Sequence, residues 1–192
     1  EIVRLLLENG ADINIKKDND GITPLMKAAE KGKKDLVQLL LDKDADVNAR
    51  SVRGVTALMM AAQNGHTEVV RLLLAKNANV NAKTKQDEKN DEVTALMMAA
   101  QNGHTEIVRL LLEKDAKVNV RTNSDDTNAL MMAAQSGYAE IVKLLLDKGA
   151  DIHAKRTNDV TALMMAAGKG YTEVVKLLVD RGADINAKNN NG

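Results

Sequence analysis

The residues best suited to acid–base or metal chemistry are few and lie in repeated, turn-like positions. The only histidines are His66, His104 and His153, and the chain has no cysteine. The first two histidines occupy the same slot of a repeated phrase, "NGHTE", as a structural turn residue would. No Gly-rich phosphate loop, Ser-His-Asp set or HExxH spacing occurs. We therefore expect no enzyme activity, no metal and no cofactor.

Two loops carry enough positive charge to raise the question of nucleic-acid binding. Arg50 and Arg53 make one loop basic, and a second basic pair lies at 155–156. Recognition of unpaired bases usually relies on aromatic stacking, and neither loop contains an aromatic residue. The loops at 83–92 and 121–126 carry as much acid as base or more. We interpret these charges as solvated loop tips and expect no nucleic-acid partner.

The composition narrows the class of protein further. The 192 residues include 27 basic and 27 acidic side chains, which argues against a dedicated binder of polyanions. The absence of cysteine excludes disulfides and zinc–thiolate sites. No apolar run reaches the roughly 18 to 20 residues of a membrane span, and no charged-then-apolar leader opens the chain. We expect a soluble, intracellular and cytoplasmic protein without a membrane partner.

Internal repetition dominates the sequence. "TPLMKAA", three copies of "TALMMAA" and "NALMMAA" begin at residues 23, 56, 94, 128 and 161, at steps of 33, 38, 34 and 33 residues. This spacing indicates a repeat array, whose units we number one to five from these positions. The predicted units are 18–50, 51–88, 89–122, 123–155 and 156–192, preceded by a partial unit at 1–17 that holds only a second helix.

Each unit reads as two short helices. Thr56 can cap a first helix, and the glycine at Gly65 can end it in a left-handed backbone conformation. The second helix starts at Thr67 and is apolar around most of its circumference. A second left-handed cap is expected at the positions of Gly10, Asp44, Asn77, Asp115, Gly149 and Gly182. Helices this short need neighbouring units for stability, which predicts an all-α repeat solenoid.

The phrases "TPLMKAA", "NGHTEVVRLLL" and "GADINAK" resemble the ankyrin repeat across essentially the whole chain. The resemblance implies two antiparallel helices per unit and a β-hairpin finger at right angles, stacked into a curved solenoid. Two features depart from the family pattern. The usual His after T-P-L is Met in every unit, and the Pro survives only as Pro24.

The resemblance also implies a protein partner, bound on the concave face that the fingers and first helices form. The implied contact residues are Arg50, Val52, Arg53, Val55, Gln63 and Asn64 in unit two, Val93, Gln101 and Asn102 in unit three, Thr127, Gln135 and Ser136 in unit four, and Thr157, Val160 and Lys169 in unit five. Five extra residues lengthen the finger at 83–92, and we consider Lys85, Gln86, Asp87, Glu88 and Lys89 as further contacts. Drift in a tolerant loop explains the insertion equally simply.

Several alternatives stay open at this point. The apolar residues Ile22, Val55, Val93 and Val160 form either a docking ridge or a packing contact between fingers. The second methionine of each pair belongs either to the core or to an adaptable binding surface. The array as a whole could instead be a structural spacer or an engineered stable scaffold with no dedicated ligand. Its uncapped terminal repeats could also stack end to end on other copies.

Overall fold

The computed structural model describes residues 9–16, 19–85 and 92–190. In these ranges the chain forms five pairs of antiparallel helices, one pair in each unit. The pairs are α2 (Pro24–Glu30) with α3 (Lys34–Asp42), α4 (Ala57–Gln63) with α5 (Thr67–Ala75), α6 (Ala95–Gln101) with α7 (Thr105–Glu113), α8 (Ala129–Ser136) with α9 (Ala139–Asp147), and α10 (Ala162–Lys169) with α11 (Thr172–Asp180). None of the described helices is long and apolar enough to cross a bilayer.

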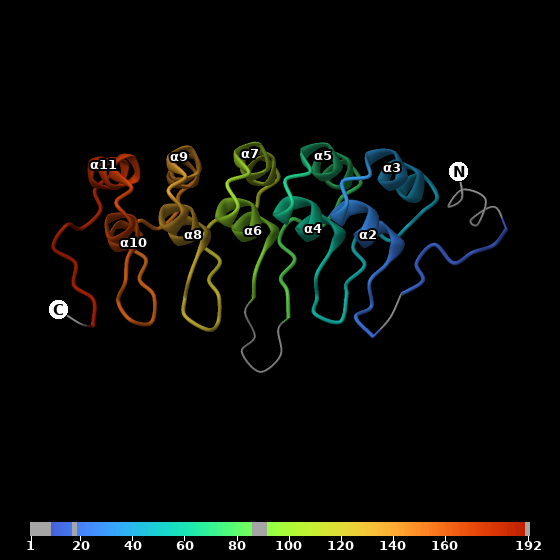
Figure 1. Ribbon diagram of the computed structural model, residues 1–192, viewed down its shortest axis with the longest axis horizontal. Helices are drawn as coiled ribbons and strands as arrows, with labels where there is room; N and C mark the ends of the chain where they lie inside the picture. The colour runs from blue at the N-terminus through green and yellow to red at the C-terminus, as the bar shows by residue number, and fades with distance from the viewer. Residues whose placement is uncertain (1–8, 17–18, 86–91, 191–192) are drawn as a thin grey trace.

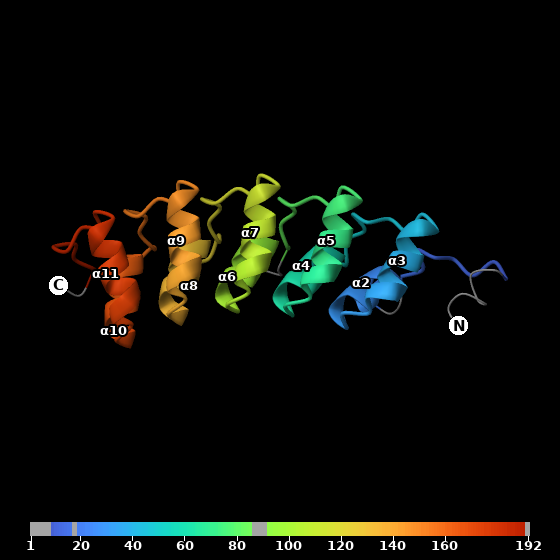
Figure 2. The same ribbon diagram turned by 90° about the horizontal axis from the view of Figure 1, so that it is seen from above.

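The helix pairs stack side by side into a single elongated array. The first helices α2, α4, α6, α8 and α10 form one row, and the second helices form another row against it (Figure 1). The described parts of the finger loops extend from the same side of the first helices, away from the second row (Figure 1). The view from above shows each pair displaced along the array from the one before it (Figure 2). This arrangement confirms the predicted all-α repeat solenoid.

Local sequence signals set the ends of the first helices. The Thr56 hydroxyl accepts a hydrogen bond of 3.3 Å from the Met59 backbone N–H, and Asn128 performs the same capping role in unit four with a bond of 3.0 Å. The glycines after the first helices have positive φ, for example 76° at Gly65. The second left-handed cap tolerates other residues, as shown by a φ of 62° at Asn77. Both predicted caps are therefore present.

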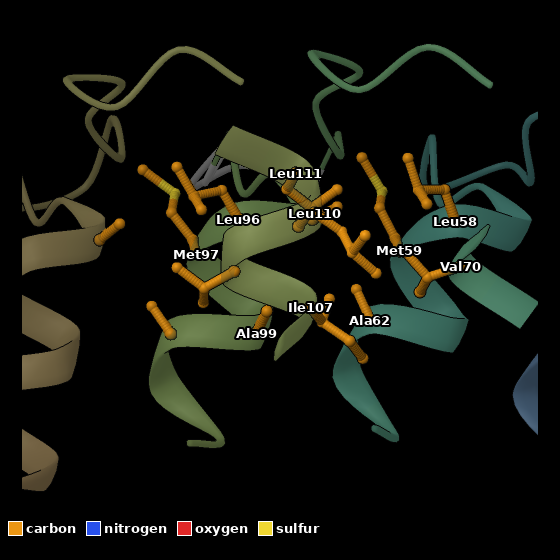
Figure 3. Packing of buried hydrophobic residues seen from close by; sticks show 14 of the residues in the cluster. Leu58, Met59, Ala62, Val70, Leu96, Met97, Ala99, Ile107, Leu110 and Leu111 are labelled. Atoms are coloured by element: carbon orange, nitrogen blue, oxygen red, sulfur yellow. The ribbon is translucent and has the colours of Figure 1, made fainter. Parts of the chain in front are cut away.

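Aliphatic side chains fill the interior between neighbouring pairs. Leu58 and Met59 of α4, and Leu96 and Met97 of α6, are each 1% exposed. Figure 3 shows these side chains gathered with Ile107 and other residues of the next second helix at the junction of two units. Small alanines on the first helices let adjacent helices approach closely. Met26 of unit one and the first methionine of each pair in units two to four are thus core residues.

The last unit departs from this pattern. Met164 is only half-buried, whereas the equivalent Met131 in unit four is fully buried. The difference arises because α10 has a described neighbour, α8, on one side only. The core expectation for the first methionine therefore does not hold in unit five.

The finger loops are held by single bridges rather than by extended strands in the described residues. Antiparallel bridges join Lys83 to Thr94, Arg121 to Asn128 and Lys155 to Thr161. Adjacent fingers are also joined: the Val52 N–H donates to the Asp20 carbonyl at 2.9 Å, and the Thr157 N–H donates to the Asp125 carbonyl at 3.2 Å. These bonds join the first finger to the second and the fourth finger to the fifth.

Candidate functional site

A shallow pocket lies between the first two fingers, next to the first helices. Ile22, Val55 and Met60 supply its apolar lining, and Asp20, Ser51 and Arg53 supply its polar lining, around a volume of about 260 Å³. All three apolar side chains are half-buried. They come from two fingers and from α4, so the pocket exists only because adjacent units stack.

The same kind of surface recurs along the array. Val93 and Met98 of unit three hold the positions of Val55 and Met60, and each is half-buried, as are Met132 of unit four and Val160 of unit five. We call Ile22, Val55, Met60, Val93, Met98, Met132 and Val160 the apolar row. The structure supports both readings of its valines, since they pack against the core cluster and still leave part of their surface accessible.

The sequence left open whether the second methionine of each pair belongs to the core or to a binding surface, and in units two to four it lies at the edge of the core. Met60, Met98 and Met132 each follow a methionine that is at most 1% exposed, yet are themselves only half-buried. A turn of about 100° per residue separates consecutive positions on a helix, so in units two to four the first methionine of each pair points into the core while the next reaches its edge. The position of each methionine around the helix was therefore the sequence signal that could have identified which one is accessible.

Polar side chains border the apolar row at the ends of the first helices. Gln63, Gln101, Gln135 and Lys169 are exposed, as expected for a contact surface. Asn64 and Asn102 are exposed too, but their amides fold back and donate to the carbonyls of their own helices, at 2.7 Å in Asn64 and 2.8 Å in Asn102. These asparagines therefore also serve as helix-end caps.

Unit four presents fewer accessible contact residues than the sequence suggested. Thr127 is only 8% exposed, because its backbone N–H bonds to the Thr122 hydroxyl and the Asp125 carboxylate and draws the residue into the finger. Ser136 is half-buried and donates from its hydroxyl to the Gln101 carbonyl at 3.3 Å. We therefore remove Thr127 from the candidate contact residues.

Two of the basic finger residues are engaged within the array. The Arg50 guanidinium donates to the Lys83 carbonyl of the next finger, and Arg156 forms an ion pair with Asp125 of the preceding finger. These charges act between units, which corrects the expectation of free, solvated tips. By contrast, the Arg53 side chain is exposed and makes no ion pair with any described residue.

The remaining predicted contacts lie at the finger tips. Val52 is 68% exposed, and Thr157 is exposed as well. Lys85 is exposed, and its N–H donates to the Arg53 carbonyl at 2.6 Å. The other four residues considered in the long finger, Gln86, Asp87, Glu88 and Lys89, lie outside the described residues.

One ion pair in the first unit is local to its first helix. The Lys27 ammonium lies 2.5 Å from the Glu30 carboxylate, and this hydrogen bond lowers the pKa of Glu30 below its usual value. Both side chains remain largely in contact with solvent, so the pair stabilises the fold little.

His66 and His104 each connect a turn of their own unit to the turn of the preceding unit. The His66 Nε2 lies 3.0 Å from the Glu30 carbonyl, and the His104 Nε2 lies 3.0 Å from the Gln63 carbonyl. Each ring covers the glycine of the preceding turn, where an added Cβ at Gly32 would lie 2.5 Å from the His66 ring. Among the described residues, no group of three His, Cys, Asp or Glu side chains is arranged to hold a metal ion.

Comparison with known proteins agrees with this architecture. The family described as Ankyrin repeats (3 copies) matches residues 1–84 and 82–156, and the single Ankyrin repeat matches residues 158–190. A BTB/POZ domain and ankyrin repeat-containing protein NBCL from Lotus japonicus is 51% identical over 55 residues, which cover 28% of this chain and 11% of that protein. With helix pairs, caps and fingers in every described unit, the chain belongs to the ankyrin repeat family.

Proposed function

We propose that this array is a non-enzymatic module that binds another protein on its concave face. Ankyrin repeats are generally protein–protein interaction modules, and the family assignment carries that general role to this chain. The observation that supports the choice of face is the apolar row, whose side chains stay partly accessible along consecutive units. The intracellular, cytoplasmic location expected from the sequence remains part of this proposal.

The surroundings of the apolar row favour a preformed recognition surface. Backbone hydrogen bonds link neighbouring fingers, and neutral amides border the row on the helix side. A surface that is already ordered loses little conformational entropy on binding, so a larger part of the contact energy appears as affinity. A solvated spacer surface would need no such row.

The spacer or scaffold role remains the second candidate, because ion pairs join neighbouring units along the second helices. Arg71 of α5 contacts Glu106 of α7 at 2.5 Å, and Arg109 of α7 contacts Glu140 of α9 at 3.2 Å. Such pairs suit a stiff rod, although exposed pairs of this kind contribute at most about 1 kcal/mol each.

Affinity capture from cell lysate with matched surface variants tests the proposal. The concave variant is Val52→Asp with Arg53→Glu, since both side chains are exposed and substitution leaves the core intact. The control is Ala75→Asp with Lys143→Glu on the second helices, which replaces an exposed apolar residue by an acid and makes the same change in charge elsewhere. A partner retained by the intact array and the control but lost from the concave variant supports the proposal. Equal captures by all three proteins favour the scaffold role.

End-to-end self-association is a separate proposal that rests on the last unit. Tyr171, Val179 and Ile185 are 36%, 42% and 68% exposed, respectively. Burial of such apolar surface against a second copy would be favourable. Sedimentation across a wide range of protein concentrations tests this, and a mass that stays at one chain throughout contradicts it.

A further inference from the structure

We propose that the partner segment on the concave face is an acidic amphipathic α-helix whose apolar side chains recur every seven residues. This inference rests on the proposed function and specifies the chemistry of the partner. It is carried by the pitch of the apolar row, by the two apolar side chains that each central unit presents, and by the charges beside them.

The pitch of the row matches seven residues of a helix. The first helices α2, α4, α6 and α8 contact one another in turn, so equivalent side chains of adjacent units lie about 10 Å apart, as packed helices do. Seven residues of an α-helix rise about 10.5 Å and return the side chain to nearly the same face. A β-strand reaches about 10 Å after three residues, but its third side chain points to the opposite face.

The width of the row separates a helix from a polyproline segment. Units two and three each offer a finger valine and a helix methionine, Val55 with Met60 and Val93 with Met98. A heptad helix presents two apolar positions in every seven residues and can meet both. A polyproline II segment has a similar pitch of about 9.3 Å per turn but presents only one side chain on that face. The pairs therefore fit a helix better.

The charges near the row favour an acidic partner. Arg53 and Lys85 are exposed at the tips of adjacent fingers, and neither side chain pairs with a described residue. Asp20 is the opposing charge at the first pocket, whereas the Glu92 carboxylate is already paired with Lys83. Among the described residues beside the row, Arg53 and Lys85 are thus two cations without a paired carboxylate, and glutamates flanking the apolar positions of the helix would lie next to them.

Selection from a displayed library tests the inference. The library holds peptides of about three heptads with random sequence, and the intact array is the bait. We expect the enriched peptides to carry apolar residues at seven-residue spacing with acidic residues beside them, and to gain helical circular dichroism on binding. Enrichment of proline-rich or extended peptides that bind the concave face would overturn the helix while leaving the proposed function standing.

Surface variants then locate the bound peptide. Met60→Gln with Met98→Gln should weaken the best peptide at least tenfold, whereas Lys143→Glu on the second-helix side should change its affinity less than twofold. Arg53→Glu should weaken a glutamate-bearing peptide severalfold, and replacing that glutamate by lysine should restore the affinity. Peptides that are indifferent to every concave substitution would overturn both the inference and the proposed choice of face. If the methionine substitutions weaken the peptide but replacing its glutamate by lysine does not restore binding to Arg53→Glu, only the acidic character of the partner is overturned.

Discussion

Replacing His153 by asparagine should strengthen the junction between the last two units. In the units before it, an asparagine at the equivalent position ties its unit to the next one. The Asn119 amide donates to the Gly149 carbonyl at 3.0 Å, and its Oδ1 accepts from the Asp151 N–H at 2.8 Å. Asn81 makes the same two bonds to the following unit, at 3.2 and 2.8 Å.

The histidine leaves this bridge unmade. No hydrogen bond joins the His153 side chain to another described residue, although the residues that would receive it, Gly182 and Asp184, follow at the expected positions. The His153 backbone N–H already bonds to the Asp151 carboxylate at 3.0 Å, as the equivalent Asn48 N–H bonds to the Asp46 carboxylate at 2.9 Å. The His153→Asn change therefore supplies only the missing amide on an unchanged loop.

The expected gain follows from two hydrogen bonds at a largely exposed site. Each bond contributes about 0.5–1.5 kcal/mol net, and ordering the side chain offsets part of the sum. We expect about 1 kcal/mol, which corresponds to roughly a fivefold change in an opening equilibrium. Because stability in repeat arrays is a sum over units and junctions, the gain should appear in the last unit.

Native-state hydrogen exchange measures this directly. Amide protection in α11 should rise about fivefold in His153→Asn, while amides of α5 stay unchanged. His153→Ala removes the imidazole without adding an amide and should leave α11 unchanged. If both variants protect α11 equally, removal of the imidazole is the cause. If neither does, the asparagine bridge contributes nothing to the junction, and the reasoning is refuted.

Three further predictions follow from the same structure. Gly103→Ala should destabilise the fold by more than about 2 kcal/mol in chemical denaturation, because φ is 76° and the new Cβ would lie 2.6 Å from the next unit's tyrosine ring. Gly170→Ala shares the positive φ but meets open space, so it should cost only about 1–2 kcal/mol. Met97→Ala should cost about 2–5 kcal/mol, and Met164→Ala clearly less, since only the former is fully buried. The pKa of Asp42 is lowered mainly by a hydrogen bond from a glutamine amide one turn earlier. The contribution of the Asp42 carboxylate to the free energy of unfolding is complete above the usual carboxyl pKa, and it is lost as the pH falls through the lowered pKa of the folded state. Asp42→Asn should therefore make the free energy of unfolding less dependent on pH in that acid range.

The elements of this fold were predictable because their signals are local. Thr56 and Gly65 specify the two ends of one helix through their own side-chain and backbone chemistry, and the same letters recur in every unit. The spacing of the repeats then identifies the partners of each helix without any long-range information. Family, fold class and caps could thus be read from the sequence alone.

The state of individual site residues could not be predicted in the same way. Arg50 is engaged because a carbonyl of the next finger, 33 residues later, lies within reach of its guanidinium. Thr127 is buried because its finger closes around two side-chain hydrogen bonds. Both outcomes depend on side-chain geometry across or within loops, for which a repeat pattern gives the position but not the conformation.

The distribution of links between units bears on where a partner can bind tightly. Units two to four are joined to their neighbours by helix packing, by asparagine bridges and by ion pairs on the second helices. The junction to unit five retains the helix packing, the Arg156–Asp125 pair and an ion pair between Arg181 and Asp147 at the ends of α11 and α9, but lacks the asparagine bridge beyond His153. A partner that bridges weakly joined units must also hold them in register, which reduces its net affinity. The identical pairs of valine and methionine in units two and three lie where the array is most firmly joined, and we expect the strongest contacts there.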